Sequence, residues 1–293
     1  MSADLYSEHF GFSERPFSLS PDPDLLFWTK DHQRAYTILE YGFETRAPLT
    51  VVTGEVGIGK TTLIQALLLR DQENEIIGLI SNAQGNRDDL LRWVLNALEI
   101  DPLGADSYVA LFERFQDFVI DAYAKGKRTV LIIDEAQNLG IETLEELRML
   151  TNINSGKHEL LQLILVGQPE LRSMIQLPEL RQFAQRVTAT YHLRPLDPAT
   201  SIKYIRHRLQ SVEGTGDEFD TAALEIVLQG SEGIPRIINK MCDLALVYAA
   251  SAGKMVVDAE IMNELIQDGV ILQTTSDPLF LTQRADLPNK AAE

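Results

Sequence analysis

The sequence predicts an α/β fold in which a parallel five-stranded sheet is followed by a small all-helical domain. Short, continuous apolar runs alternate with helix-length amphipathic stretches between residues 49 and 193, and only helical patterns remain after Pro195. Apolar strands separated by helices are typical of a parallel sheet that is covered on both faces. With 293 residues, 45% of them hydrophobic, the chain is long enough to bury such a core.

The strands are predicted from short apolar runs, and the helices from apolar positions that recur with the helical period. The predicted strands cover residues 49–52, 76–80, 130–133 and 161–166, with a weaker fifth strand at 187–193. The predicted helices between them cover residues 61–70, 88–99, 108–124 and 141–152. The predicted helices of the C-terminal part cover residues 198–212, 221–229, 235–250 and 258–268.

These patterns divide the chain into four parts. Residues 1–48 form an aromatic, proline-rich entry segment in which a helical pattern starts at about Asp31. Residues 49–195 form the α/β core, and residues 196–270 form the helical domain. Residues 271–293 contain two prolines and little periodicity, so we expect a flexible tail.

Composition limits the kinds of partner. The chain has 26 basic and 43 acidic residues, a formal net charge of −17, which disfavours default binding to nucleic acid or anionic lipid. The single cysteine, Cys242, cannot form an internal disulfide and is predicted to be a small buried hydrophobic residue. No signal peptide and no membrane-spanning run is visible, so we expect a cytoplasmic protein that reaches the inner membrane only through a partner.

The strongest motif is Gly54-Glu-Val-Gly-Ile-Gly-Lys-Thr61, which matches the P-loop pattern G-x-x-x-x-G-K-[ST] between a predicted strand and a predicted helix. Its glycines let backbone N–H groups turn towards phosphates, and the helix N-terminus adds its positive dipole end. Lys60 is expected to neutralise the β- and γ-phosphates of ATP, and the Thr61 hydroxyl to bind Mg²⁺. The expected nucleotide-binding residues of this loop are Gly54, Glu55, Val56, Gly57, Ile58, Gly59, Lys60, Thr61 and Thr62.

Polar residues follow two further strands. The run 129–133 ends in Asp134 and Glu135, at the strand edge where open α/β sheets bind ligands. Asp134 is expected to hold Mg²⁺ through water, and Glu135 to polarise the water that attacks the γ-phosphate. Gln168 follows the next strand, where it could reach the γ-phosphate or that water; the alternative is an ordinary turn residue.

Three arginines are further candidates. Arg181 and Arg186 are predicted on a helix just before the fifth strand, at an edge that would face the ATP of a neighbouring subunit in a ring or filament. We favour Arg186, because it immediately precedes the strand, although either could be a solvated surface charge. Arg236 lies near the start of a predicted helix, where a positive charge is locally unfavourable unless it faces a phosphate.

Taken together, these residues resemble those of an AAA+ ATPase of the P-loop NTPase class, with Gln168 as the first sensor and Arg236 as the second. More narrowly, the chain resembles the ExeA/GspA family of general secretion pathway ATPases and the related ATPases of pilus and exopolysaccharide loci. That match rests on three stretches: His9-Phe-Gly-Phe-Ser-Glu-Arg-Pro-Phe17 followed by Pro21-Asp-Pro23, Gly167-Gln-Pro-Glu-Leu171, and Gly233-Ile-Pro-Arg-Ile-Ile-Asn-Lys-Met-Cys-Asp243.

The resemblance implies a helical lid domain at 196–270 and an ATP-driven homo-oligomer, as a ring, that helps to assemble or operate a cell-envelope complex. Secretion-type members of this family continue into a transmembrane helix and a periplasmic part. Because this chain stops at Glu293, we expect a shorter member that acts beside polysaccharide or pilus machinery.

Two other functions compete with this one. The first is a nucleic-acid-associated AAA+ regulator of the kind that selects targets for transposition; the acidity of the chain and the few residues after the lid count against it. The second is a switch that binds nucleotide with little hydrolysis, which has no need of Glu135. Adenine recognition is open, and Phe17, Leu19 and the region of His32 are candidates for the wall of its pocket.

Overall fold

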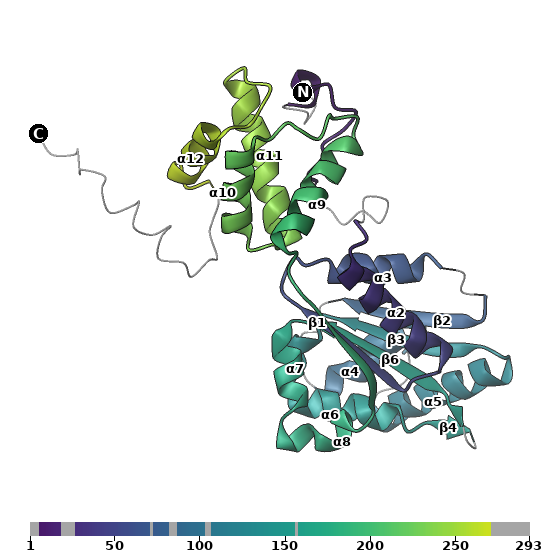
Figure 1. Cartoon of the computed structure of the whole chain (residues 1–293). Helices are drawn as coiled ribbons and strands as arrows, with labels where there is room; N and C mark the ends of the chain where they lie inside the picture. Colours follow the sequence, from purple (N-terminus) through teal and green to yellow (C-terminus); the bar gives the residue numbers. More distant parts are fainter. Residues whose placement is uncertain are drawn as a thin grey trace, which may run out of the picture. The chain divides into compact units, whose positions relative to one another are not determined.

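A computed structural model describes residues 6–18, 27–70, 73–81, 87–102, 107–155 and 158–270 (Figure 1). The chain divides into two compact units. The core unit is Asp22–Arg194, and the helical unit combines Met1–Pro21 with Pro195–Glu293. The expected tail 271–293 and Leu19, a candidate adenine contact, lie outside the described residues.

The core unit contains the predicted parallel sheet. Its strands are β1 (Leu49–Gly54), β2 (Glu75–Ser81), β3 (Arg128–Asp134), β6 (Leu161–Gly167) and β7 (Val187–Leu193), in the order β2-β3-β6-β1-β7. All neighbours are parallel. Thr53 pairs with Gly167, and Ser81 pairs with Asp134, so the carboxyl ends of the strands lie at one edge of the sheet.

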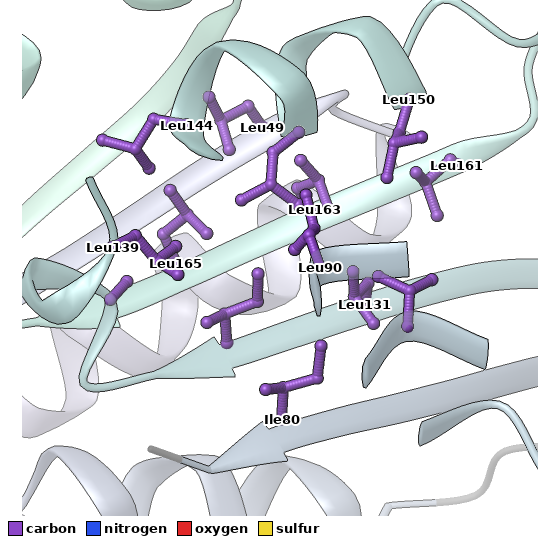
Figure 2. Close-up of a cluster of buried hydrophobic side chains, with 14 of the residues drawn as sticks. Leu49, Ile80, Leu90, Leu131, Leu139, Leu144, Leu150, Leu161, Leu163 and Leu165 are labelled. Atoms are coloured by element: carbon purple, nitrogen blue, oxygen red, sulfur yellow. The ribbon is translucent and has the colours of Figure 1, made fainter. Parts of the chain in front are cut away.

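Side chains alternate between the two faces of the sheet, and each face is buried under helices. One face packs on α4 (Arg87–Ala97), α5 (Tyr108–Ala124) and α6 (Ile141–Leu150). Figure 2 shows the centre of this cluster, including Leu49, Leu131, Leu161, Leu163 and Leu165 from the strands and Leu90, Leu144 and Leu150 from the helices. The residues between them on the strands, including Val52, Val130, Ile132, Ile164 and Val166, face α2 (Lys30–Glu44) and α3 (Lys60–Leu68). This alternation confirms the doubly covered sheet predicted from the sequence.

The helical unit contains α9 (Pro198–Gln210), α10 (Thr221–Ser231), α11 (Pro235–Ser251) and α12 (Ala259–Gln267), close to the predicted ranges. Three of these helices start at an aspartate whose side chain accepts a backbone N–H of the first turn: Asp197, Asp220 and Asp258. Such N-caps satisfy amides that the helix itself leaves unpaired. Cys242 is fully buried in α11.

The N-terminal segment differs from the single entry segment 1–48 expected from the sequence. Residues 6–18, which include the one-turn helix α1 (Ser7–Phe10), belong to the helical unit, whereas α2 packs on the sheet. Tyr6 and Arg15 both donate to the carboxylate of Asp243 on α11. Phe17 is fully buried, with its ring edge-on to Phe219 at a centroid distance of 6.3 Å. The aromatic motif of the N-terminus is therefore part of the hydrophobic core of the helical unit.

Several short elements were not predicted. They are β4 (Asn154–Ser155) and β5 (His158–Glu159), which pair as antiparallel strands, the helix α7 (Pro169–Ile175), and the 3-10 turns η1 (Ala136–Asn138) and η2 (Pro178–Leu180). The helix predicted just before the fifth strand is α8 (Arg181–Ala184), which ends before Arg186. Within the described residues, no helix is both long enough and apolar enough to cross a membrane.

Candidate active site

The predicted P-loop connects the end of β1 to the start of α3. Gly57 and Gly59 adopt φ angles of +77° and +105°, a backbone region that side chains other than glycine rarely enter. At Gly54 the constraint is the available space. A Cβ there would lie 3.0 Å from Leu193 Cβ and 3.1 Å from Ile58 Cγ2. Glycine at these three positions therefore lets the loop curl at the N-terminus of α3 without backbone strain or close contacts.

The imidazole ring of His32, near the start of α2, contacts the backbone of this loop. Its Nε2–H donates to the Ile58 carbonyl at 3.1 Å, and its Nδ1 accepts from the Thr29 hydroxyl at 2.7 Å. Burial lowers the pKa of His32, which matches the neutral ring that this bonding needs. A Cβ on Gly59 would lie 3.0 Å from His32 Nε2, so the ring also fits closely against the loop. The adenine-contact role expected for the region of His32 is not tested by these contacts.

Lys60 is buried beneath the loop. Its Nζ donates to the carbonyl oxygens of Gly54 at 2.8 Å and Glu55 at 2.9 Å. Burial lowers the pKa of Lys60, while the nearby carboxylates of Glu135 and Asp134 act in the opposite direction. The ammonium group is thus held at the phosphate-binding loop by neutral acceptors, which phosphate oxygens can replace with stronger charge-assisted bonds.

Thr61 and Asp134 meet at the carboxyl edge of the sheet. The Thr61 hydroxyl donates to Asp134 Oδ2 at 2.8 Å, and Asp134 Oδ1 accepts the Glu135 backbone N–H at 2.9 Å. Hydroxyl and carboxylate oxygens are ligands that Mg²⁺ prefers, together with waters and substrate phosphates. In the described part of the chain, no group of three or more His, Cys, Asp or Glu side chains could hold a metal. The pair fits a magnesium ion that takes its other ligands from water and nucleotide.

Glu135 and Gln168 come together at the same edge. Gln168 Nε2 donates to Glu135 Oε2 at 3.1 Å, and Gln137 Nε2 donates to the same oxygen at 2.6 Å. Partial burial raises the pKa of Glu135, but these two bonds and the Lys60 charge outweigh it, so the pKa lies below its usual value. Gln137 was not singled out from the sequence. The only signal for it was its place two residues after the Asp134-Glu135 pair.

The sequence is similar to proteins of known families. Residues 44–175 match the AAA domain family. The chain is 40% identical over 250 residues to "General secretion pathway protein A" of Aeromonas hydrophila, an alignment that covers 85% of the chain and 46% of that protein. The chain is an ExeA/GspA-like AAA ATPase. It spans about half the length of this curated relative.

Solved structures show the same fold at low sequence identity. The AAA ATPase superimposes on the Aeropyrum pernix ORC2 protein with a TM-score of 0.65 at 17% identity, covering 91% of this chain and 74% of that one. It superimposes on domain III of the Thermotoga maritima replication initiation protein DnaA with a TM-score of 0.55 at 20% identity, covering 86% and 98%. At these identities the likeness concerns the fold alone.

The two candidate finger arginines of the ATPase have different surroundings. Arg186 does not lie on a helix as predicted, because α8 ends at Ala184 and Arg186 occupies the turn before β7. Its guanidinium donates to Thr151 O at 3.3 Å and to Asn152 Oδ1, and it pairs with Glu159 at 3.6 Å. Arg181, the first residue of α8, is exposed and has no hydrogen-bond or ion-pair partner among the described residues.

Arg236 belongs to the helical unit. It is the second residue of α11, directly after Pro235, and its side chain is exposed. A cation in the first turn of a helix meets the positive end of the helix dipole. The role of Arg236 as a sensor of bound nucleotide stays a prediction.

Proposed function

We propose that this ATPase binds ATP with Mg²⁺ at the carboxyl edge of its sheet, hydrolyses it as an oligomer, and drives the assembly or operation of a cell-envelope complex. The observation that carries the chemical part is the meeting of Lys60, Thr61, Asp134 and Glu135 at one strand edge, with Thr61 and Asp134 joined at 2.8 Å. The envelope part is supported by the 40% identity to general secretion pathway protein A.

Binding begins at the P-loop. The N–H groups of residues 55–61 and the positive end of α3 favour the phosphates, and Lys60 exchanges two carbonyl oxygens for phosphate oxygens. Thr61 and Asp134 are the residues that would hold Mg²⁺. When bound, the metal supplies positive charge that neutralises the phosphates.

Hydrolysis requires an acceptor for the proton of the attacking water. Glu135 suits this role, because its lowered pKa keeps it ionised at neutral pH. Gln168 lies beside it and can contact the water or the γ-phosphate with its amide. As the cleavage proceeds, Lys60 stabilises the charge that develops on the phosphate oxygens.

A neighbouring subunit would complete the site with an arginine. Arg181 is free to reach outward, whereas Arg186 would have to leave Thr151, Asn152 and Glu159. The structure therefore gives a reason to test Arg181 beside Arg186, the residue favoured from sequence. Each arginine-to-alanine variant should be mixed with Lys60→Ala protein. Recovery of activity in the mixture supports a finger acting in trans, and no recovery at any ratio for either variant contradicts it.

Arg236 is proposed to report the nucleotide to the helical unit. Its exposed guanidinium lies at the positive end of the α11 dipole, and a bound phosphate would offset that repulsion. Arg236→Ala should then keep nucleotide affinity and lose turnover. Unchanged turnover in this variant would remove Arg236 from the site.

The cellular role is tested by affinity purification from the native host. Glu135→Gln protein, held in its ATP state, should retain envelope-assembly proteins, and Lys60→Ala protein, which cannot enter that state, is the matched control. Recovery of DNA or a recombinase that resists moderate salt would contradict the envelope role. The formal charge of −17 makes nucleic acid the less favoured partner.

A further inference from the structure

Gln137 uses both ends of its side-chain amide within the candidate active site. Its Nε2 donates to Glu135 Oε2 at 2.6 Å, and its Oε1 accepts the backbone N–H of Gln168 at 2.9 Å. One side chain therefore connects the carboxylate at the end of β3 with the turn at the end of β6. A side chain that carries only a donor or only an acceptor could make one of these two contacts but not both.

The neighbouring backbone is shaped around this amide. A Cβ on Gly167 would lie 2.8 Å from Gln137 Oε1, 2.9 Å from Leu171 Cδ2 and 3.3 Å from Gln137 N, so glycine at the end of β6 leaves space that the amide and the Leu171 side chain fill. Glu135 itself has φ of +55°, an uncommon conformation for a residue with a side chain. The chain turns at Glu135 directly into η1, which contains Gln137. This turn brings the Gln137 side chain close to the Glu135 carboxylate.

The pattern of donors leaves one oxygen of Glu135 open. Gln137 and Gln168 both donate to Oε2. Within the described part of the chain, Oε1 receives no hydrogen bond, so it is the oxygen available to a water molecule. With Oε2 fixed by two amides, rotation of the carboxylate is restrained and the open oxygen has a defined direction.

We propose that Gln137 is a positioning residue for ATP hydrolysis, which holds the Glu135 carboxylate and the Gln168 turn in one arrangement. The inference rests on the proposed role of Glu135 as the residue that activates water. Gln137 does not contact the P-loop in any hydrogen bond of the described residues, so its effect should fall on turnover and not on nucleotide affinity.

The test compares Gln137→Met with Gln176→Met, which makes the same chemical change at an exposed glutamine at the end of α7. For both variants, kcat and KM for ATP and the Kd of a non-hydrolysable ATP analogue are measured. We expect kcat of Gln137→Met to fall roughly 10- to 100-fold, less than the about 10²- to 10⁴-fold that general-base catalysis contributes. KM and Kd should stay within about threefold of the wild-type values, since the contacts that bind the nucleotide in its ground state are unchanged. Gln176→Met should behave as wild type.

Gly167→Ala provides a second variant, in which no polar residue is replaced. Its added methyl group would displace the Gln137 amide, so it should reproduce the loss in kcat. In a Glu135→Gln background, Gln137→Met should cause a smaller loss than in the wild-type background, because one of the two groups that it holds, the carboxylate, is already missing.

The outcomes separate this inference from the role of Glu135. If Glu135→Gln alone keeps normal turnover, the proposed role of Glu135 is refuted. If Glu135→Gln loses turnover while folded Gln137→Met and Gly167→Ala keep kcat within twofold of wild type, only the role of Gln137 is refuted. A loss of analogue affinity equal to the loss of kcat/KM would also overturn it, since Gln137 would then support binding.

Discussion

Replacing Lys60 by alanine should remove nucleotide binding while leaving the fold intact. The ammonium makes two hydrogen bonds, to Gly54 O at 2.8 Å and Glu55 O at 2.9 Å, that can be redirected to phosphate oxygens. Hydrogen bonds to charged groups contribute about 1.5–3 kcal/mol each, so their joint loss costs at least about 3 kcal/mol. That corresponds to roughly 100-fold weaker binding or more.

Thermal unfolding converts this loss into a simple readout. With ADP or ATP at about 100 times the wild-type Kd, binding stabilises the protein by about 2.7 kcal/mol, and the variant retains about 0.4 kcal/mol at the same concentration. For the unfolding of a unit as large as the core unit, Asp22–Arg194, these values correspond to increases in Tm of about 5–11 °C and about 1 °C. The Tm of the nucleotide-free variant should stay close to wild type, because burial already disfavours the Lys60 charge.

The control is Lys203→Ala, which removes an exposed lysine from α9. It should keep the full increase in Tm on adding nucleotide. If Lys60→Ala shows the wild-type increase, the contacts of Lys60 do not mark the phosphate site. That result would refute the assignment of this loop.

Three further changes test other parts of the structure. Gly59→Ala should lower the free energy of unfolding by roughly 1–3 kcal/mol, because Gly59 has φ of +105° and a Cβ there would contact His32. Gly126→Ala is the control and should cost less, since Gly126 has φ of +76° but no atom lies within 4 Å of its Cβ position. Equal losses of the two variants in urea unfolding would contradict this. Because burial lowers the pKa of His32 below the value of 6.5 for a free histidine, the unfolded chain takes up the proton first, and stability should fall as the pH drops below that value. His32→Gln should remove this part of the pH dependence, and an unchanged slope between about pH 7.5 and 5.5 would assign it to another group. Leu163→Ala, at the centre of the core in Figure 2, should lower the free energy of unfolding by about 2–5 kcal/mol, and a loss below about 1 kcal/mol would mean that this cluster is loosely packed.

The sheet and its ligand edge could be predicted because their signals are local in sequence. The strand at 130–133 is continuously apolar and is flanked by polar residues, and the observed strand extends it only to Arg128–Asp134. The P-loop glycines likewise report backbone conformations that few other residues adopt. The alternation of strands and helices then limits the topology, since parallel strands need crossover helices.

Features that depend on contacts distant in sequence could not be predicted. Tyr6 and Arg15 donate hydrogen bonds to Asp243, which is more than 220 residues away in the sequence. Nothing near the N-terminus therefore indicated that residues 6–18 belong with the C-terminal helices. The contacts of Arg186 with Thr151 and Asn152 likewise could not be predicted, because these residues are more than 30 positions away in the sequence.

Gln137 was missed for a different reason. An amide three residues after a strand is common in turns, and the importance of this one depends on the turn at Glu135 and on the missing Cβ of Gly167. Both become visible only when β3 and β6 are placed side by side in the sheet.

The most direct test of the account is the steady-state ATP turnover of Glu135→Gln protein in Mg²⁺, measured together with its affinity for ATP. Because the amide keeps the shape of the side chain and cannot accept the proton, we expect unchanged affinity and a kcat at least about 100-fold below wild type. Turnover near wild type with normal affinity would contradict the assignment of Glu135 as the residue that activates water.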